Sequence, residues 1–285
     1  MKQIDQKLLT GERALFASRS LKVTDSVFAD GESPLKESSQ LEIEGCIFKW
    51  KYPLWYCEDV RVSGTTLLET ARSGIWYTKN ITVTDSVIDA PKTFRRSEGI
   101  SLRRVSMPRA QETMWDCREV NMDTVSIVGD YFGMRCDRVR CDNITVSGNY
   151  LFDGASNVEV SNSKLISKDA FWNCENVTVR NCTVIGEYLA WNSRNVTFID
   201  CVIESNQGLC YAQGLTLVNC KLINTDLAFE YSTVNAEIVS EIDSVKNPTA
   251  GSIKAKRIGQ IIMEPERVDT SKTVITVSEG DGYEQ

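Results

Sequence analysis

Hydrophobic and polar positions alternate along most of this chain in short units that recur at nearly regular intervals. LKVTDSVF, which starts at Leu21, and VTVRNCTV, which starts at Val177, are two examples. Apolar residues occupy the first, third and eighth positions, Asn, Asp or Gly the fifth, and a small residue or Cys the sixth. Alternation predicts a strand with one buried face, and Asn, Asp or Gly can adopt the left-handed conformation of a sharp corner. Each unit therefore predicts a strand, a corner and a second strand.

The spacing of these units determines the predicted fold. A single coil cannot bury its apolar face, whereas stacked coils share a continuous core. Stretches such as AFWNCEN and LAWNSRN precede the units and supply a third strand. We therefore predict an all-β, single-stranded, right-handed parallel β-helix (solenoid) of about 12 coils with three short strands per coil. The twelve units begin 19 to 21 residues apart, at Leu21, Leu41, Val60, Ile81, Ile100, Val120, Val139, Val158, Val177, Val196, Leu215 and Val234.

Two other solenoids fit the repeat less well. A left-handed β-helix would show a hexapeptide rhythm, which this chain lacks. A leucine-rich repeat is nearer, because the segment from Cys174 to Val184 fits its consensus. Its period is usually about 20 to 29 residues, however, and coils of 19 leave too few residues for a helix. The right-handed β-helix remains the prediction.

Composition and charge limit the class of protein. The chain has 285 residues, 42% hydrophobic and 25% charged, as in an ordinary globular protein. We expect one β-helix domain over 1–285, with an N-terminal cap and first partial coil at 1–20, coils at 21–263, and a C-terminal cap or tail at 264–285. Neither an export signal nor an apolar stretch of about 20 residues is present, which predicts a cytoplasmic protein without membrane contact. The net charge of −7 argues against nucleic-acid binding.

Most of the ten cysteines follow the repeat, which favours a role in packing. No CxxC pair and no histidine occur, so we expect no metal site, and no glycine loop or other motif indicates a cofactor. The other residues in these columns are mainly Ser, Thr, Ala and Val, which predicts small buried side chains. Cys46, Cys182, Cys201 and Cys220 follow the corner, and Cys57, Cys117, Cys136 and Cys174 lie three positions before a unit.

The units DAFWNCENVTVRNCTV and GEYLAWNSRNVTFIDCVI, with the earlier VTDSVF and VTDSVI, carry a family resemblance. From about residue 14 to 262 the chain resembles an uncharacterised bacterial family, known only as a domain of unknown function and similar to pectin-lyase-like right-handed β-helices. The resemblance implies the fold and carries no catalytic residue. The calcium-binding carboxylate clusters of pectate lyases have no match in this sequence.

The third strand allows two orientations. Strict alternation buries a tryptophan column (Trp55, Trp76, Trp115, Trp172 and Trp191), whereas a kink buries the apolar column before it (Leu54, Ile75, Phe94, Met114 and Phe171). Both orientations point the next column outward. That outward column contains Glu37, Tyr56, Tyr77, Arg96, Asp116, Arg135, Gly154, Asn173, Asn192, Tyr211 and Glu230.

Aromatic, amide and charged groups spaced about 4.8 Å apart suit an extended polysaccharide, because rings stack on sugars and polar groups hold hydroxyls or carboxylates. Nine arginines from Arg95 to Arg140 favour an acidic polysaccharide, because guanidinium groups bind carboxylates. An ordinary solvated face with ladder pairs between neighbouring strands would show the same residue types. The candidate ligand-binding residues are Tyr56, Tyr77, Arg95, Trp115, Asn173, Asn192 and Tyr211.

Asp116, Arg96 and Arg135 are the catalytic candidates. Asp116 should lie between the two arginines, one coil from each, where two cations would keep it ionised and able to act as a base. Such a trio would suit a polysaccharide lyase. A glycoside hydrolase needs a second carboxyl group, for which Glu112 and Asp153 are the nearest candidates. A structural ion-pair ladder would use the same trio without catalysis.

A different class of function is a non-catalytic scaffold. Its sheet faces would recognise a protein partner or a second copy of the chain, and an exposed aromatic stripe suits either role. The sequence thus leaves open whether the protein is an enzyme. The two partners to test are a saccharide ligand and a second copy of the chain in a homo-oligomer.

Overall fold

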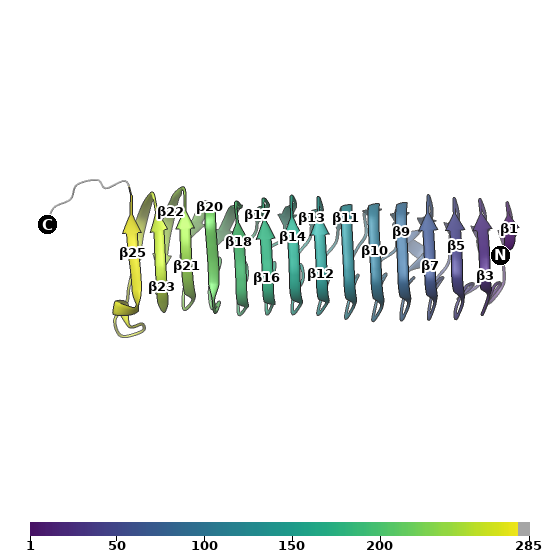
Figure 1. Cartoon of the computed structure of the whole chain (residues 1–285), viewed down its shortest axis with the longest axis horizontal. Coiled ribbons are helices and arrows are strands. Elements are labelled where there is room, and N and C mark those ends of the chain that lie inside the picture. Colours follow the sequence, from purple (N-terminus) through teal and green to yellow (C-terminus); the bar gives the residue numbers. More distant parts are fainter. Residues whose placement is uncertain (279–285) are drawn as a thin grey trace. The chain divides into compact units, whose positions relative to one another are not determined.

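Parallel β-strands joined by turns make up the described structure, a computed structural model of residues 1–278 (Figure 1). The chain divides into two compact units, Met1–Gly148 and Asn149–Gln285, which we describe separately as the first and second unit. Strands in each unit pair with the equivalent strands of the next turn, so each unit is a β-solenoid. The described part contains no helix long and apolar enough to cross a membrane.

The main sheet of the first unit has one strand from each of eight turns. Its register pairs Leu21 with Leu41 and Leu41 with Val60, so the first apolar positions of successive units form one row, as the repeat predicted. The strands are β1 (Lys2–Asp5), β3 (Arg19–Thr24), β5 (Ser39–Glu44), β7 (Glu58–Ser63), β9 (Lys79–Ile88), β10 (Glu98–Met107), β11 (Arg118–Val128) and β12 (Asp137–Asp142).

A corner and a second short strand follow each main strand. Asp25 and Asp85 take positive φ values of 45° and 49° at this corner, which is the role expected of an Asn, Asp or Gly. In β9, β10 and β11 the second strand continues the first without a break. Elsewhere in the first unit it is β2 (Leu8–Leu9), β4 (Val27–Phe28), β6 (Ile47–Phe48), β8 (Thr66–Leu67) or β13 (Thr145–Ser147), and a 3-10 turn, η1, covers Glu69–Ala71.

The second unit repeats this arrangement over seven turns and adds a small separate sheet. Its main strands are β14 (Ser156–Ser161), β16 (Glu175–Arg180), β18 (Arg194–Ile199), β20 (Leu215–Asp226), β21 (Thr233–Ile238), β23 (Ala250–Ala255) and β25 (Thr273–Val277). The second strands are β15 (Lys164–Ile166), β17 (Thr183–Ile185) and β19 (Val202–Asn206). The separate sheet pairs β22 (Glu241–Lys246) with β24 (Arg257–Ile262), and η2 spans Thr270–Lys272.

The two units together have about 15 turns, eight and seven, whereas the sequence predicted about twelve. The three additional turns contain β1, β23 and β25. β1 lacks the apolar first residue because Lys2 occupies the row of Leu21. β23 and β25 lie 17 and 22 residues after their neighbours, since Val234 pairs with Gly251 and Gly251 with Thr273. Of the expected C-terminal cap or tail, residues 279–285 lie outside the described part.

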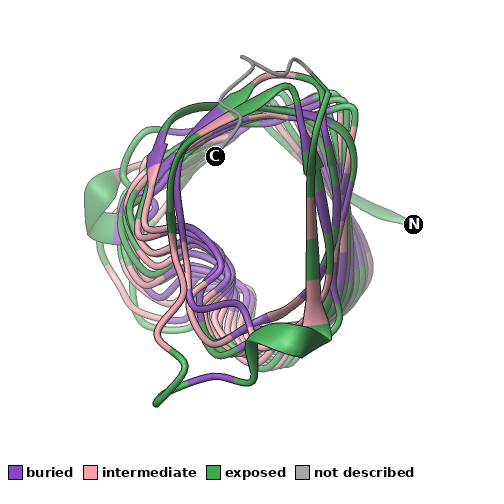
Figure 2. Cartoon of the chain, turned by 90° about the vertical axis from the view of Figure 1, so that its left-hand side faces the viewer, coloured by how far each residue is buried: buried purple, intermediate pink, exposed green. Residues whose placement is uncertain are grey.

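The core of each unit consists of the inward rows of these strands. Val23, Ile43 and Val62 form one such row in the first unit and are almost completely buried. Figure 2 shows buried segments recurring on successive turns, between exposed segments. This pattern is what stacking predicts, because each turn covers the apolar face of its neighbour.

The third side of the coil differs from the prediction. A strand was expected there, but most of this side consists of turn residues, and isolated β-bridges occur at Trp76, Arg95 and Trp115. Left-handed residues cause the difference, because Phe94 and Met114 have φ values of 54° and 62°. A residue in that conformation bends the chain and interrupts the ladder of a regular strand.

Candidate functional site

The outward column of the third side lies at a second corner of the coil. Tyr56, Tyr77 and Arg96 adopt positive φ values of 57°, 57° and 49°. The backbone N–H of each donates to a carbonyl of the next turn; Tyr56, for example, bonds to Trp76 at 2.9 Å. The bend resolves the two orientations of the third side. Leu54 and the other apolar residues of its column are buried, and the tryptophans are half-buried.

The column tryptophans of the first unit (Trp55, Trp76 and Trp115) are each held by a hydrogen bond from the ring nitrogen. Nε1 of Trp55, Trp76 and Trp115 donates to the carbonyls of Ser73, Lys92 and Tyr131 at 2.5, 2.8 and 2.7 Å. The rings of Trp55 and Trp76 stack with their centroids 5.0 Å apart. Because the polar atom is satisfied by the backbone, the indoles serve as a rigid platform along the third side.

Arg95 continues this stack in place of a tryptophan. Its guanidinium carbon lies 4.7 Å from the ring centroid of Trp76 and 4.5 Å from that of Trp115. Its Nε and Nη2 are shielded from solvent and have no hydrogen-bond partner among residues 1–278, and Glu112 Oε2 lies 4.0 Å from Nη2. These two nitrogens cannot reach an external ligand. The arrangement therefore indicates a packing role for Arg95.

The tyrosines form a second stack beside the indoles. The rings of Tyr56 and Tyr77 are parallel, with centroids 4.7 Å apart, and Lys36 Nζ lies 5.6 Å from the ring centroid of Tyr56. Arg96 Nη1 donates to the hydroxyl of Tyr77 at 3.4 Å. The facing surfaces of the two rings are thus covered, while Tyr56 is 49% exposed. A ligand on this column would meet ring edges, hydroxyls and the guanidinium group of Arg96.

Asp116 contacts one of its two expected arginines. Arg135 donates from Nε to Oδ1 at 2.7 Å and from Nη2 to Oδ2 at 3.1 Å, which is a two-point ion pair. Arg96 is one turn away on the other side, but it contacts Tyr77 and forms no ion pair within residues 1–278. Instead of the predicted trio, Asp116 and Arg135 form an ion pair, and Arg96 has no carboxylate partner within residues 1–278.

The second carboxyl group of a hydrolase has no clear candidate beside Asp116. Glu112 forms ion pairs with Lys92 at 3.1 Å and with Arg95. Asp153 belongs to the second unit, where its Oδ1 accepts a hydrogen bond from the amide of Asn173 at 2.8 Å. Both carboxylates thus have partners of their own.

The remaining predicted ligand residues lie in the second unit and form another ladder. Asn192 donates to Asn173 at 2.8 Å, so the side-chain amides are linked from turn to turn. Tyr211 packs at 60° against Trp191, with centroids 5.0 Å apart, and also contacts Tyr231. These contacts are ladder pairs of the kind that stabilise sheets.

Residues 2–276 match the family model described as "Protein of unknown function (DUF3737)". The chain belongs to the DUF3737 family. This membership confirms the resemblance to a family of unknown function. A comparison with curated protein sequences gives no match for the DUF3737 chain.

Two solved structures are similar to the DUF3737 chain. The A-module of the mannuronan C-5 epimerase AlgE4 of Azotobacter vinelandii is 9% identical, with a TM-score of 0.33, over 97% of this chain and 87% of that one. The pentapeptide repeat protein HetL, involved in heterocyst differentiation regulation in the cyanobacterium Nostoc sp. strain PCC 7120, is also 9% identical, with a TM-score of 0.22, over 88% of each chain.

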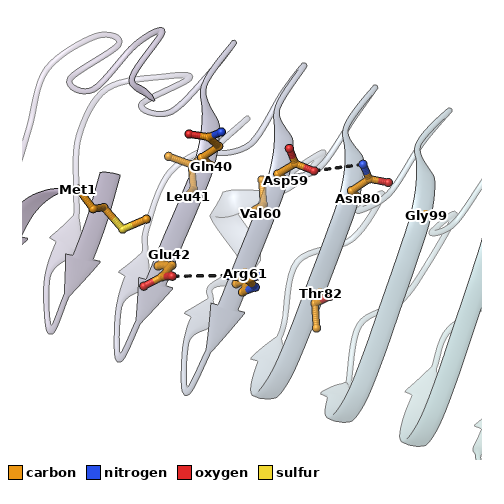
Figure 3. Close-up of a pocket in the computed structure, with 10 residues that line it drawn as sticks. All are labelled: Met1, Gln40, Leu41, Glu42, Asp59, Val60, Arg61, Asn80, Thr82 and Gly99. Carbon is orange, nitrogen blue, oxygen red and sulfur yellow. Dashed lines mark hydrogen bonds and ion pairs between the residues drawn. The ribbon is translucent and has the colours of Figure 1, made fainter. Parts of the chain in front are cut away.

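A hollow on the outer face of β5, β7, β9 and β10 in the DUF3737 chain was not predicted (Figure 3). Its volume is about 460 Å³, and Gly99 is among the residues that line it. Asn80 donates to Asp59 at 3.1 Å, and Arg61 lies 3.5 Å from Glu42, so its polar groups are largely paired with one another. The outward positions of these strands, such as Arg61 and Thr82, are the sequence feature that marks this face.

All ten cysteines of the DUF3737 chain are buried free thiols. Burial raises the pKa of Cys57 and of Cys174 to about 12, which keeps both protonated near neutral pH. Among the described residues, no group of three or more Cys, Asp or Glu side chains is arranged to hold a metal ion. The cysteines therefore pack as small apolar residues.

Proposed function

We propose that the DUF3737 chain binds an acidic saccharide on the outward column of its first unit, at a surface that we call the Tyr–Arg ledge (Tyr56, Tyr77 and Arg96). The observation that carries the proposal is the guanidinium group of Arg96. It is exposed, donates to the hydroxyl of Tyr77 and has no carboxylate partner in the part of the chain that the structure describes. An open guanidinium group is suited to bind a carboxylate through paired hydrogen bonds.

The stacking of the tyrosines decides how a sugar would be held. Because the rings of Tyr56 and Tyr77 cover each other's faces, a sugar ring has little aromatic surface on which to lie. A sugar would therefore be held mainly by hydrogen bonds to the tyrosine hydroxyls and to Arg96. A ligand with carboxylate groups, such as a uronate chain, suits this surface better than a neutral sugar.

The same contacts favour binding over catalysis. Both oxygens of Asp116 accept a hydrogen bond from Arg135, so the carboxylate is engaged in a two-point ion pair. Glu112 and Asp153, the two candidates for a second carboxyl group, each have partners of their own. We therefore propose a binding protein, without the lyase or hydrolase activity that the sequence left open.

A glycan array of acidic and neutral oligosaccharides tests this proposal. We expect wild-type protein to retain oligouronates in preference to neutral glucans, and Arg96→Ala to lose them. Arg104→Ala is a matched control, because Arg104 is an exposed arginine held by Asp85 at 2.6 and 2.8 Å, away from the ledge. Equal retention of neutral and acidic glycans, or equal binding by Arg96→Ala and wild type, would contradict it.

A further inference from the structure

The second unit ends in two strands that pair on one side only. Within the described residues, β25 pairs with β23 and β24 pairs with β22, and neither has a partner on its other edge. An edge strand carries a row of free backbone N–H and C=O groups that can pair with another chain. The end of this unit is therefore a potential interaction surface.

Core-facing side chains are uncovered at this end. Ile261 occupies the row of Val245, and Val277 occupies the row of Ala255. Val245 and Ala255 are almost completely buried, whereas Ile261 is 48% exposed and Val277 is 45% exposed. The last turn thus presents an apolar inward face that no following turn covers within the described part.

The two ends of the chain differ in charge at the equivalent positions. In the first unit, the edge strand β1 places Lys2 in the inward row of Leu21. An inward-pointing charge is a common protection of an edge strand against pairing. β25 has the sequence TVITV, which is uncharged, rich in β-branched residues, and free of Pro and Gly. One end is therefore protected and the other is suited to pairing.

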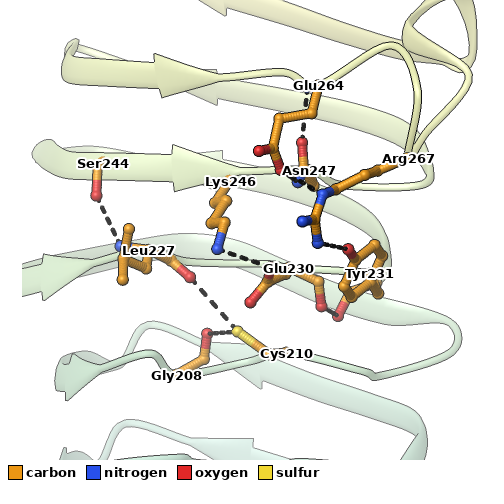
Figure 4. Close-up of polar contacts among 11 residues, drawn as sticks. Gly208, Cys210, Leu227, Glu230, Tyr231, Ser244, Lys246, Asn247, Glu264 and Arg267 are labelled. Atoms are coloured by element: carbon orange, nitrogen blue, oxygen red, sulfur yellow. Dashed lines mark hydrogen bonds and ion pairs between the residues drawn. The ribbon is translucent and has the colours of Figure 1, made fainter.

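Polar contacts hold the segment before β25 in place (Figure 4). Arg267 donates to the Tyr231 hydroxyl at 3.2 Å and lies 3.3 Å from Glu264. The backbone N–H of Glu264 donates to Asn247 at 2.9 Å. These contacts connect the turn after β24 to the preceding turns. Because the turn is fixed, β25 does not need to be ordered when it pairs, and the entropic cost of association is lower.

We propose that this end binds a second copy of the chain, with β25 antiparallel to β25 of the partner subunit about a two-fold axis at Ile275. This register places Thr273 opposite Val277 of the partner subunit and Ile275 opposite the partner's Ile275. The inward faces of both strands then lie on the same side of the joined sheet, so the two cores become continuous. The inference is independent of saccharide binding.

A head-to-tail arrangement is less favourable. It would place β1 of one copy against β25 of another and bring Lys2 into the inward row that ends at Thr273. Burying an unpaired lysine is costly. The two-fold arrangement avoids this cost and also closes the assembly at two copies, whereas head-to-tail contacts would continue into a fibre.

Sedimentation velocity and light scattering on the full chain test the proposal. We expect a mass of twice 32.0 kDa for the wild type. Val277→Lys and Ile261→Lys should each give the monomer mass, and both residues are exposed enough in the single chain for a lysine to remain solvated. Ser252→Lys, on the outward face of β23, is the control and should stay dimeric.

Three outcomes would overturn the proposal. The first is a wild-type chain that is monomeric at the highest concentration tested. The second is a dimer that persists in both Val277→Lys and Ile261→Lys, which would place the interface elsewhere. The third is a chain that dimerises only after residues 279–285 are deleted, which would show that this segment occupies the edge.

Discussion

Arg135 binds both carboxylate oxygens of Asp116, with Nε 2.7 Å from Oδ1 and Nη2 3.1 Å from Oδ2. The pair closes one end of the Tyr–Arg ledge. Since Asp116 is satisfied by Arg135, it does not neutralise Arg96, which lies one turn away on its other side. The proposed function depends on this division between a paired and an open arginine.

Asp116→Asn should strengthen the binding of an oligouronate. The substitution removes a negative charge next to Arg96 and the charged partner in the ion pair with Arg135. Exposed ion pairs are worth about 0.2–1 kcal/mol, so we expect an increase in affinity of roughly two- to fivefold at low salt. Isothermal titration calorimetry measures it. A weaker affinity would mean that Asp116 itself contacts the ligand.

Arg95→Ala should reduce stability and leave saccharide affinity unchanged. The guanidinium group lies between two indole rings, and its loss should cost about 1–2 kcal/mol in the free energy of unfolding. Thermal unfolding and the same titration separate the two effects. If affinity fell at least tenfold while the melting temperature stayed constant, Arg95 would be a ligand residue.

Met114→Ala tests the bend of the third side. Met114 is buried at a φ of 62°, and truncation of a buried methionine costs about 2–5 kcal/mol. Val128→Ala, at a residue 49% exposed, should change stability by less than about 0.5 kcal/mol. Urea unfolding compares them. Equal effects would indicate that Met114 faces solvent.

The buried thiols should be unreactive in the folded protein. Burial raises the pKa of Cys57, Cys174 and Cys210 from 9.0 to about 12, so their thiolates are scarce at pH 8. We expect negligible reaction with a disulfide reagent until urea exposes all ten thiols. Rapid modification of folded protein at pH 8 would show that a cysteine is accessible.

The same pKa shifts predict how stability changes with pH. The folded state holds these protons more tightly than the unfolded state, so the stabilisation is fully present below pH 9. It is lost as pH rises from about 9 towards 12, where the folded thiols also ionise. Melting temperatures from pH 7 to 11 should fall above pH 9, and a flat profile would contradict the burial of the thiols.

The repeat in the sequence predicted most of the fold. Rows such as Leu21, Leu41 and Val60 follow directly from the spacing, because stacked coils align equivalent positions. The first turn was predicted only as a cap and partial coil, and the turns of β23 and β25 were not counted among the twelve units, for identifiable reasons. Lys2 replaces an apolar residue at the start, and Gly251 follows Val234 by 17 residues, which breaks the period.

The side-chain arrangement of the site could not be predicted to the same extent. Phe94 and Met114 adopt left-handed φ values that their residue types do not indicate, so alternation alone could not orient the tryptophans. The column order did place Asp116 between two arginines. Which arginine binds it depends on the rotamers of long side chains, and the sequence does not encode these in a readable pattern.

Titration of the protein with an oligogalacturonate hexamer at low and at physiological salt measures whether Arg96 holds an acidic saccharide. We expect wild type and Arg104→Ala to bind alike, and Arg96→Ala to lose about 10- to 100-fold in affinity, as for the loss of hydrogen bonds to a charged group. Binding should weaken at the higher salt concentration. Equal affinities of Arg96→Ala and wild type, or no binding by wild type at either salt concentration, would contradict the account.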